Sequence, residues 1–148
     1  MQAFKHLNII FVLIAGLLIL AGGFFVWQNF DSSNKKNIVS IRGQAFEIEK
    51  VITQTDKQKG LGERQNLCVD CGMLFVFDNP DKYAFWMKDM QFALDILWLK
   101  DGKVVFLEKN ILPTFKGTLT PTEDADQVLE INAGKVDELG IEVGDAVW

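Results

Sequence analysis

The longest apolar stretch of the chain lies close to its start. Leu7–Trp27 runs for 21 residues without a charged side chain, which matches the roughly 20 residues that a helix needs to cross a bilayer. A cleaved signal peptide has an apolar core of only about 7–15 residues, although Ala21–Gly23 offers small residues for a cut. We therefore predict an uncleaved transmembrane helix or signal anchor at 7–27, after a tail at 1–6.

The charges beside this segment give two indications of its orientation. Lys5 precedes it, whereas Lys35, Lys36 and Arg42 follow it, and a count of near-helix positive charges alone would keep the domain in the cytoplasm. A positive charge ahead of an apolar run this near the N-terminus is instead the layout of a secretory signal. We expect a single-pass protein of the cell membrane, with a polar linker at 28–37 and the domain at 38–148 outside the cytoplasm.

Beyond residue 37 the apolar positions recur in short runs that are typical of strands. Gly43 and Asp101–Gly102 supply hairpin turns, and Asp78–Asp81 has the composition of a turn. Thr55 is the expected N-cap of a short helix through Lys59. A second helix is expected at Ala133–Leu139, and Ala146–Trp148 closes the chain. The predicted strands are Val39–Ile41, Ala45–Ile52, Met73–Phe77, Tyr83–Met87, Asp95–Leu99, Val104–Glu108 and Gln127–Ile131.

This pattern predicts an all-β fold, a β-sandwich or barrel-like domain of about seven short strands with two short helices, preceded by one transmembrane helix. From residue 38 onward the domain has 12 Lys and Arg against 19 Asp and Glu, a net charge of −7. Nucleic-acid binding depends on clustered basic side chains. We therefore expect no nucleic-acid partner.

Several chemistries are excluded because the domain has no histidine. The one histidine of the chain is His6, and the only serine after residue 37 is Ser40. Triads of the Ser–His–Asp or Cys–His kind are therefore absent, as are the commonest ligands of catalytic zinc. Carboxylate, lysine and cysteine chemistry remain, and we expect neither a metal nor a cofactor.

Cys68 and Cys71 form a C-x-x-C motif. A redox dithiol needs a stabilised thiolate, usually at a helix N-terminus, but an apolar strand follows here. A zinc site would need two further ligands from carboxylates or a second chain. We favour a structural disulfide, as expected in an oxidising compartment, with a redox pair and a metal site as alternatives.

The segment FWMKDM, residues 85–90, combines aromatic, thioether and charged side chains. If it is a strand, Trp86 and Lys88 share one face. Simple packing beside a solvated edge is the plainer interpretation. A bulky Trp next to a charge also suits the rim of a concave ligand site, so both side chains are candidates for ligand binding.

Polar residues within the apolar strands give further candidates. Asp95 opens one strand, and Glu130 and Asn132 share a face of another by the period of two. Asp95 and Glu130 would serve as acid and base if they met in a pocket, although acids at strand ends more often accept hydrogen bonds from turns. Arg64 is a candidate partner for one of these acids.

Six short blocks occur in an order that resembles the domain of unknown function 192 family, a prokaryotic family. The resemblance covers about residues 38–148 and implies a compact β-sandwich-like fold, often behind an export signal, without a settled activity. Gly62 departs from it, because the family more usually has Met there. The blocks are GLGER (60–64), GMLFVF (72–77), FWMKDM (85–90), LDILWL (94–99), VLEINAG (128–134) and GIEVGD (140–145).

Two classes of function follow from these observations. The first is a membrane-tethered, extracytoplasmic module that binds a small molecule or glycan, or serves as an accessory protein. The second is a carboxylate-type enzyme such as a glycan hydrolase, with Asp95 and Glu130 at its centre. A thiol–disulfide protein that uses Cys68 and Cys71 is a weaker third. We favour the binding module.

Overall fold

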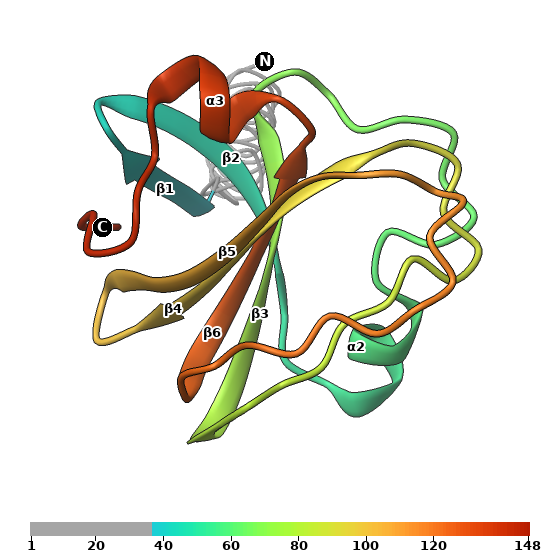
Figure 1. The fold of residues 1–148 in the computed structure, drawn as a ribbon, viewed down its shortest axis with the longest axis horizontal. Coiled ribbons are helices and arrows are strands. Elements are labelled where there is room, and N and C mark those ends of the chain that lie inside the picture. The colour runs from blue at the N-terminus through green and yellow to red at the C-terminus, as the bar shows by residue number, and fades with distance from the viewer. Residues whose placement is uncertain (1–36) are drawn as a thin grey trace, which may run out of the picture. The chain divides into compact units, whose positions relative to one another are not determined.

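The computed structural model describes residues 37–148, which form a mostly β domain with two short helices (Figure 1). This confirms the predicted all-β class. The elements in chain order are β1 (Asn37–Ile41), β2 (Gln44–Val51), α2 (Gln54–Lys59), β3 (Cys71–Asp81), β4 (Leu94–Lys100), β5 (Lys103–Ile111), β6 (Ala125–Asn132) and α3 (Lys135–Leu139).

The six strands form one sheet in the order β1-β2-β3-β6-β4-β5. Neighbouring strands are antiparallel except β2 and β3, which are parallel and are joined by a crossover that contains α2. Both predicted hairpins are present. At the β4–β5 turn Asp101 and Gly102 have φ of 50° and 69°, the positive values that a two-residue turn of this kind requires.

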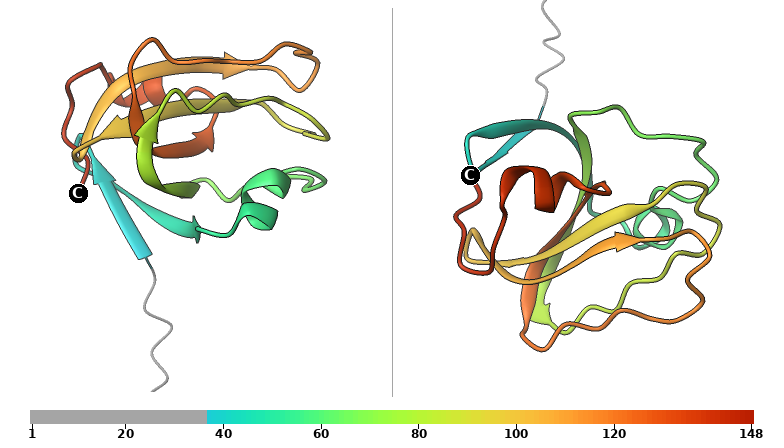
Figure 2. Two further views of the ribbon diagram at one scale, coloured as in Figure 1. Left: turned by 90° about the horizontal axis from the view of Figure 1, so that it is seen from below. Right: turned by 45° about the horizontal axis from the view of Figure 1, so that its top comes forward.

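The C-terminal residues bridge both edges of this sheet. Val147 pairs with Ile41 at the end of β1, and Ala146 pairs with Lys103 at the start of β5. The backbone of Trp148 also exchanges two hydrogen bonds with Ser40. The sheet is therefore curled and closed in a barrel-like manner, not divided into two packed sheets (Figure 2).

Alternation along the central strands produces a hydrophobic cluster on each face of the sheet. β4 is buried on both faces, because Leu97 and Leu99 belong to one cluster while Ile96 and Trp98 belong to the other. The first cluster includes Val136 of α3, and the second includes Leu61, just after α2. α2 and the long loops gather on one side of the sheet, away from α3 (Figures 1 and 2). Both clusters consist of residues of the domain itself.

Two predictions around β3 were wrong. β3 continues through Asp78–Asp81, where a turn was expected; the ladder with β6 shifts register between Val76 and Asp81, and such an irregularity accommodates Pro80, which cannot donate a ladder hydrogen bond. Tyr83–Met87 is not a strand. Only Phe85 pairs there, in a single bridge with Leu119, and Asp89 adopts a positive φ of 59° that ends the extended course.

The N-cap of α2 is Thr53, and not Thr55 as predicted. Thr53 has extended backbone angles and its hydroxyl accepts a hydrogen bond from the Asp56 amide at 3.2 Å, which is the geometry of an N-cap. Thr55 lies within the helix.

Residues 37–148 contain no helix that is long and apolar enough to span a membrane. The predicted tail at 1–6, the helix at 7–27 and the linker up to residue 36 lie outside the described residues.

Candidate functional site

A pocket of about 350 Å³ lies between one face of the sheet, α2 and the segment that follows β3. This volume is in the range of small-molecule sites, which are mostly apolar with a few polar groups. Its apolar lining comes from β3, from the turn after α2 and from residues 84–90: Leu61, Phe75, Phe77, Phe85, Trp86 and Met90.

Ring contacts fix the aromatic wall of the pocket. Phe77 stacks on Tyr83 with centroids 3.5 Å apart, and Phe85 meets Phe75 edge-on at 4.9 Å. Behind them Trp98 packs edge-on against Phe85, and its indole N–H donates to the Tyr83 carbonyl at 2.8 Å. These contacts tie the 83–85 segment to the sheet, so the wall is preformed.

Glu130 of β6 contributes the one buried acid of the pocket lining. Its residue is 5% exposed, and its Oε2 atom has no hydrogen-bond partner among residues 37–148. Burial raises the pKa of this carboxyl to about 8, and the positive charge of Arg64 offsets only part of that effect. Glu130 is therefore mostly protonated at neutral pH, and it is able both to donate and to accept a hydrogen bond.

Arg64 was predicted to pair with Asp95 or Glu130, but its partner is Glu49 of β2. The Arg64 Nη2 atom lies 2.9 Å from Glu49 Oε1 and 2.8 Å from Oε2. This ion pair joins the segment after α2 to β2. Arg64 does not line the pocket that contains Glu130. Because Arg64 pairs with Glu49, it forms no ion pair with the buried Glu130 carboxyl.

Polar and charged side chains surround the solvent end of the pocket. Lys57 and Lys59 come from α2, which buries none of its residues, and Lys88 comes from the segment after β3. The Lys57 ammonium lies 4.3 Å from the centroid of the Phe77 ring. Trp86 is 48% exposed beside them. The predicted candidates Trp86, Lys88 and Glu130 thus meet at one pocket.

Asp95 lies on the opposite face of the sheet from Glu130. In the β4–β6 ladder Asp95 pairs with Ile131, whereas Glu130 pairs with Ile96, so successive residues place the two carboxyls on different faces. Asp95 accepts hydrogen bonds from the Asn110 amide at 2.7 Å and the Val136 amide at 2.8 Å. It holds α3 against the sheet, and the predicted acid–base pair does not exist.

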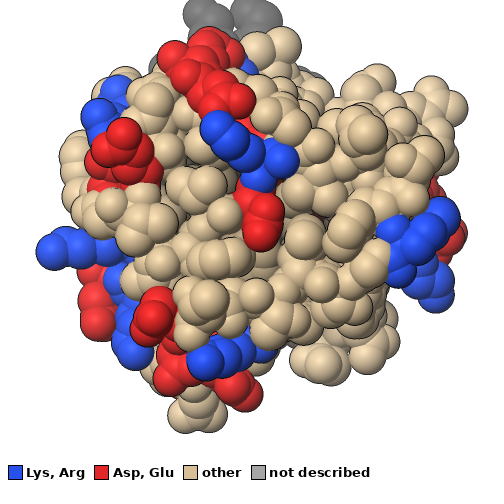
Figure 3. All heavy atoms as spheres, in the orientation of Figure 1, with Lys and Arg blue, Asp and Glu red and all other residues tan. Residues whose placement is uncertain are grey.

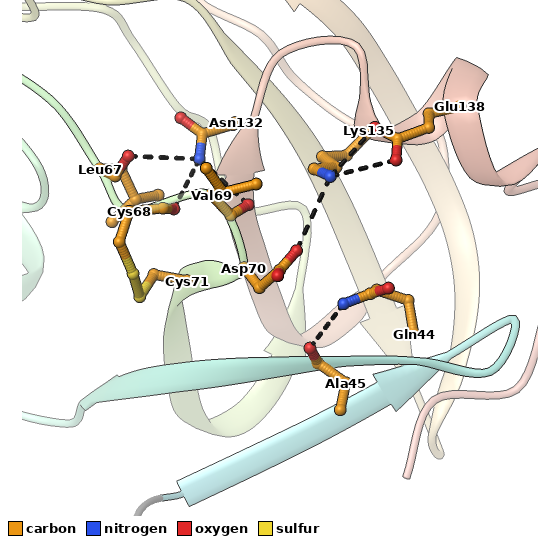
Figure 4. Close-up of polar contacts among 10 residues, drawn as sticks. All are labelled: Gln44, Ala45, Leu67, Cys68, Val69, Asp70, Cys71, Asn132, Lys135 and Glu138. Atoms are coloured by element: carbon orange, nitrogen blue, oxygen red, sulfur yellow. Dashed lines mark hydrogen bonds and ion pairs between the residues drawn. A yellow bond between two sulfur atoms is a disulfide. The ribbon is translucent and has the colours of Figure 1, made fainter.

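Asn132 shares a face with Glu130, as the strand period predicted, but it binds the cysteine loop. Its side-chain amide donates to the Cys68 carbonyl at 2.8 Å, with longer contacts to Leu67 and Val69 (Figure 4). Cys68 and Cys71 form a disulfide with their Cα atoms 5.2 Å apart. Within residues 37–148 no three His, Cys, Asp or Glu side chains are grouped to hold a metal ion.

The disulfide loop is anchored at one further point. Lys135 of α3 reaches Asp70 at 3.7 Å while pairing with Glu138 at 3.0 Å (Figure 4). Asn132 and Lys135 therefore hold the two sides of this loop. The disulfide between the two cysteines agrees with the favoured interpretation of the motif.

The pocket also uses residues that sequence reasoning missed. The sequence analysis placed Lys57 and Lys59 in a short helix and Tyr83 in a strand, and gave none of the three a role in binding. The one signal in the sequence was that the helix QTDKQK, residues 54–59, has no apolar position to bury. Gly62, which departs from the family pattern, lines the pocket too, and a side chain there would meet the Lys59 carbonyl at 3.0 Å.

The fold and this pocket define a small all-β domain with a preformed cavity of ligand size. The chain belongs to the DUF192 family, described as "Uncharacterized ACR", whose model matches residues 37–148. This confirms the resemblance drawn from the six sequence blocks.

Two solved structures share the fold. A protein of unknown function from Novosphingobium aromaticivorans DSM 12444 is 32% identical, with a TM-score of 0.73 over 80% of this chain and 88% of that one. A protein described as a "putative transcription regulator" from Sinorhizobium meliloti 1021 is 29% identical, with a TM-score of 0.72 over 80% and 96%. No curated protein matches the chain.

Proposed function

We propose that this protein is a membrane-tethered, extracytoplasmic binding module whose pocket takes a small organic molecule or a glycan unit. A ring of the ligand lies against the aromatic wall, and a polar group meets Glu130. The observation that carries the proposal is the Oε2 atom of Glu130, which is buried in the pocket lining without a hydrogen-bond partner among the described residues.

The physical reason is the cost of that arrangement. A buried polar atom without a partner costs roughly 1–3 kcal/mol, and a chain that needed this position only for packing would do better with an apolar side chain. A ligand hydroxyl or amide would satisfy Glu130 and recover the cost on binding. The carboxylate-enzyme alternative is not proposed, because Asp95 lies on the other face of the sheet.

Two features support the proposed location. Residues 7–27 have the length and composition of a membrane anchor. The Cys68–Cys71 disulfide is of a kind that persists in oxidising compartments. Protease added to intact cells stripped of their walls should therefore degrade the domain. If the domain is cut only after lysis, it lies in the cytoplasm.

The S. meliloti relative is described as a "putative transcription regulator". We do not propose a DNA-binding function for this protein from that description. The domain carries a net charge of −7, and on the face shown in Figure 3 the basic side chains lie scattered among acidic ones without a continuous stripe. Phosphate backbones are bound by clustered basic residues. A nucleic-acid partner is therefore not part of this proposal.

The test is a thermal-shift screen of small hydroxylated and ring-containing compounds against residues 37–148, which contain both hydrophobic clusters. A ligand that binds only the native state raises the apparent melting temperature. The ligand-induced shift should vanish in Trp86→Ala and Glu130→Leu and persist in Trp148→Ala. Trp148 is a matched control because it is exposed and does not line the pocket. Equal shifts in all the variants would place the site elsewhere.

A further inference from the structure

The charges around the pocket differ in sign from those of the domain as a whole. The domain has 12 basic and 19 acidic side chains. The pocket lining instead contains three lysines, Lys57, Lys59 and Lys88, against Asp78 and the buried Glu130. With Glu130 protonated, the lining carries a net positive charge within an acidic domain.

These three lysines are also without carboxylate partners among residues 37–148. The ion pairs of the described domain involve Arg42, Arg64, Lys109 and Lys135, all outside the pocket. An acidic surface offers many carboxylates to a mobile lysine, yet Lys57 lies over the Phe77 ring. The ammonium groups are therefore available at the mouth of the pocket.

We infer that the ligand of this pocket is an acid: a ring that bears a hydroxyl group at one end and a carboxylate at the other. The inference rests on the proposed function and adds the ligand class. The hydroxyl meets the Glu130 carboxyl at the buried end, the ring lies against Phe77, Tyr83 and Trp86, and the carboxylate meets the exposed lysines.

Burial decides which group lies at which end. Glu130 is almost fully buried, and a neutral hydroxyl enters such an environment at far lower cost than a carboxylate does. Lys59 and Lys88 are exposed and Lys57 is half-buried, so the anion remains partly hydrated while it is paired. A cationic ligand is disfavoured because it would pass three ammonium groups to reach Glu130.

Two kinds of compound carry this chemistry, aromatic hydroxy acids and acidic sugars. The probes are 4-hydroxyphenylacetate with its neutral counterpart 2-(4-hydroxyphenyl)ethanol, and glucuronate with its neutral counterpart glucose. Calorimetric titration of each into the domain gives four dissociation constants. We expect one acid to bind at least tenfold more tightly than its neutral counterpart, and the pair that shows this identifies the source.

The lysines are tested by charge removal with a matched control. Replacing Lys57, Lys59 and Lys88 together with Gln should weaken binding of the acid about tenfold, since partly exposed ion pairs contribute modestly each, and should leave the neutral counterpart within about twofold. Replacing Lys50, Lys103 and Lys116 with Gln removes the same charge away from the pocket and should change neither. Raised salt should weaken the acid alone.

The outcomes separate this inference from the proposed function. If the neutral compounds bind as tightly as the acids, and binding is lost in Glu130→Leu but not in the lysine variant, the pocket binds ligands and the acid inference is wrong. If both lysine triples weaken the acid equally, the attraction is general and the inference is also wrong. If none of the four probes binds, both ideas are overturned for these ligand classes.

Discussion

Asp95 and Glu130 are buried acids on neighbouring strands of one sheet, and they point to opposite faces of it. Asp95 accepts two backbone hydrogen bonds, whereas the Oε2 atom of Glu130 accepts none from the described chain. One acid therefore stabilises the fold, and the other is the group that the proposed ligand would meet. Their substitution should have opposite consequences.

Replacing Asp95 with Ala should destabilise the domain by roughly 2–5 kcal/mol, because the amides of Asn110 and Val136 would lose their acceptor. Glu130→Leu should be neutral or stabilising at pH 8, since it removes an unsatisfied buried carboxyl. Urea denaturation of both variants measures the difference. Comparable destabilisation by the two changes would contradict the separate roles.

Glu130 should also make stability depend on pH. Its folded pKa of about 8 lies above the ordinary 4.5, so the folded state holds a proton that the unfolded state releases. Its contribution is fully present below pH 4.5 and is lost as the pH rises through about 8, by at most about 1.4 kcal/mol per pH unit. Glu130→Gln should flatten the curve between these limits.

Asp137 and Asp145 act in a different pH window. Hydrogen bonds from Lys109 and Arg42, respectively, lower the pKa of these two carboxyls, so their contributions are lost as the pH falls below their ordinary 3.8. Denaturation measured from pH 4.5 to 9 therefore isolates Glu130. A wild-type curve that matches Glu130→Gln throughout this range would show that Glu130 titrates normally.

The strands and hairpins followed from sequence because their causes are local. Gly43 and Asp101–Gly102 determine the hairpin turns. The alternation of apolar and polar residues determines which side chains share a face of β6. The pocket depended on tertiary placement. The sequence alone did not show that Asp95 and Glu130 lie on opposite faces of the sheet, because this follows from the register between strands. It also did not show that Lys57 lies over Phe77, because the crossover connection brings α2 there. The single bridge at Phe85 likewise depends on the distant Leu119.

The cysteine pair should contribute little to stability. The loop that the disulfide closes is very short, and chain-entropy reasoning gives about 2 kcal/mol or less for a loop of this size. Replacing both Cys68 and Cys71 with Ser should lower the unfolding free energy by no more than that and leave ligand binding intact. Loss of binding on reduction of the wild type would instead favour the thiol–disulfide alternative.

Gly72 should not tolerate a side chain. A Cβ atom there would lie 2.9 Å from the Glu130 carbonyl and 3.0 Å from the Ile48 side chain. Overpacking of this kind costs typically 1–3 kcal/mol. We expect Gly72→Ala to lower the melting temperature, whereas Gly134→Ser is not a clean control because of its positive φ. An exposed change such as Ala146→Ser serves that purpose, and equal stability of the two variants would contradict the packing described for β3.

The most direct test of the role proposed for Glu130 is its side-chain ¹³C carboxyl signal, assigned by its absence in Glu130→Gln. It is followed first with pH and then during titration with 4-hydroxyphenylacetate and glucuronate. The role proposed for Glu130 predicts a midpoint near pH 8 in the free domain and a saturable shift of this signal with one of the acids. A midpoint near 4.5, or a signal that stays fixed while the acid saturates the protein, would contradict it.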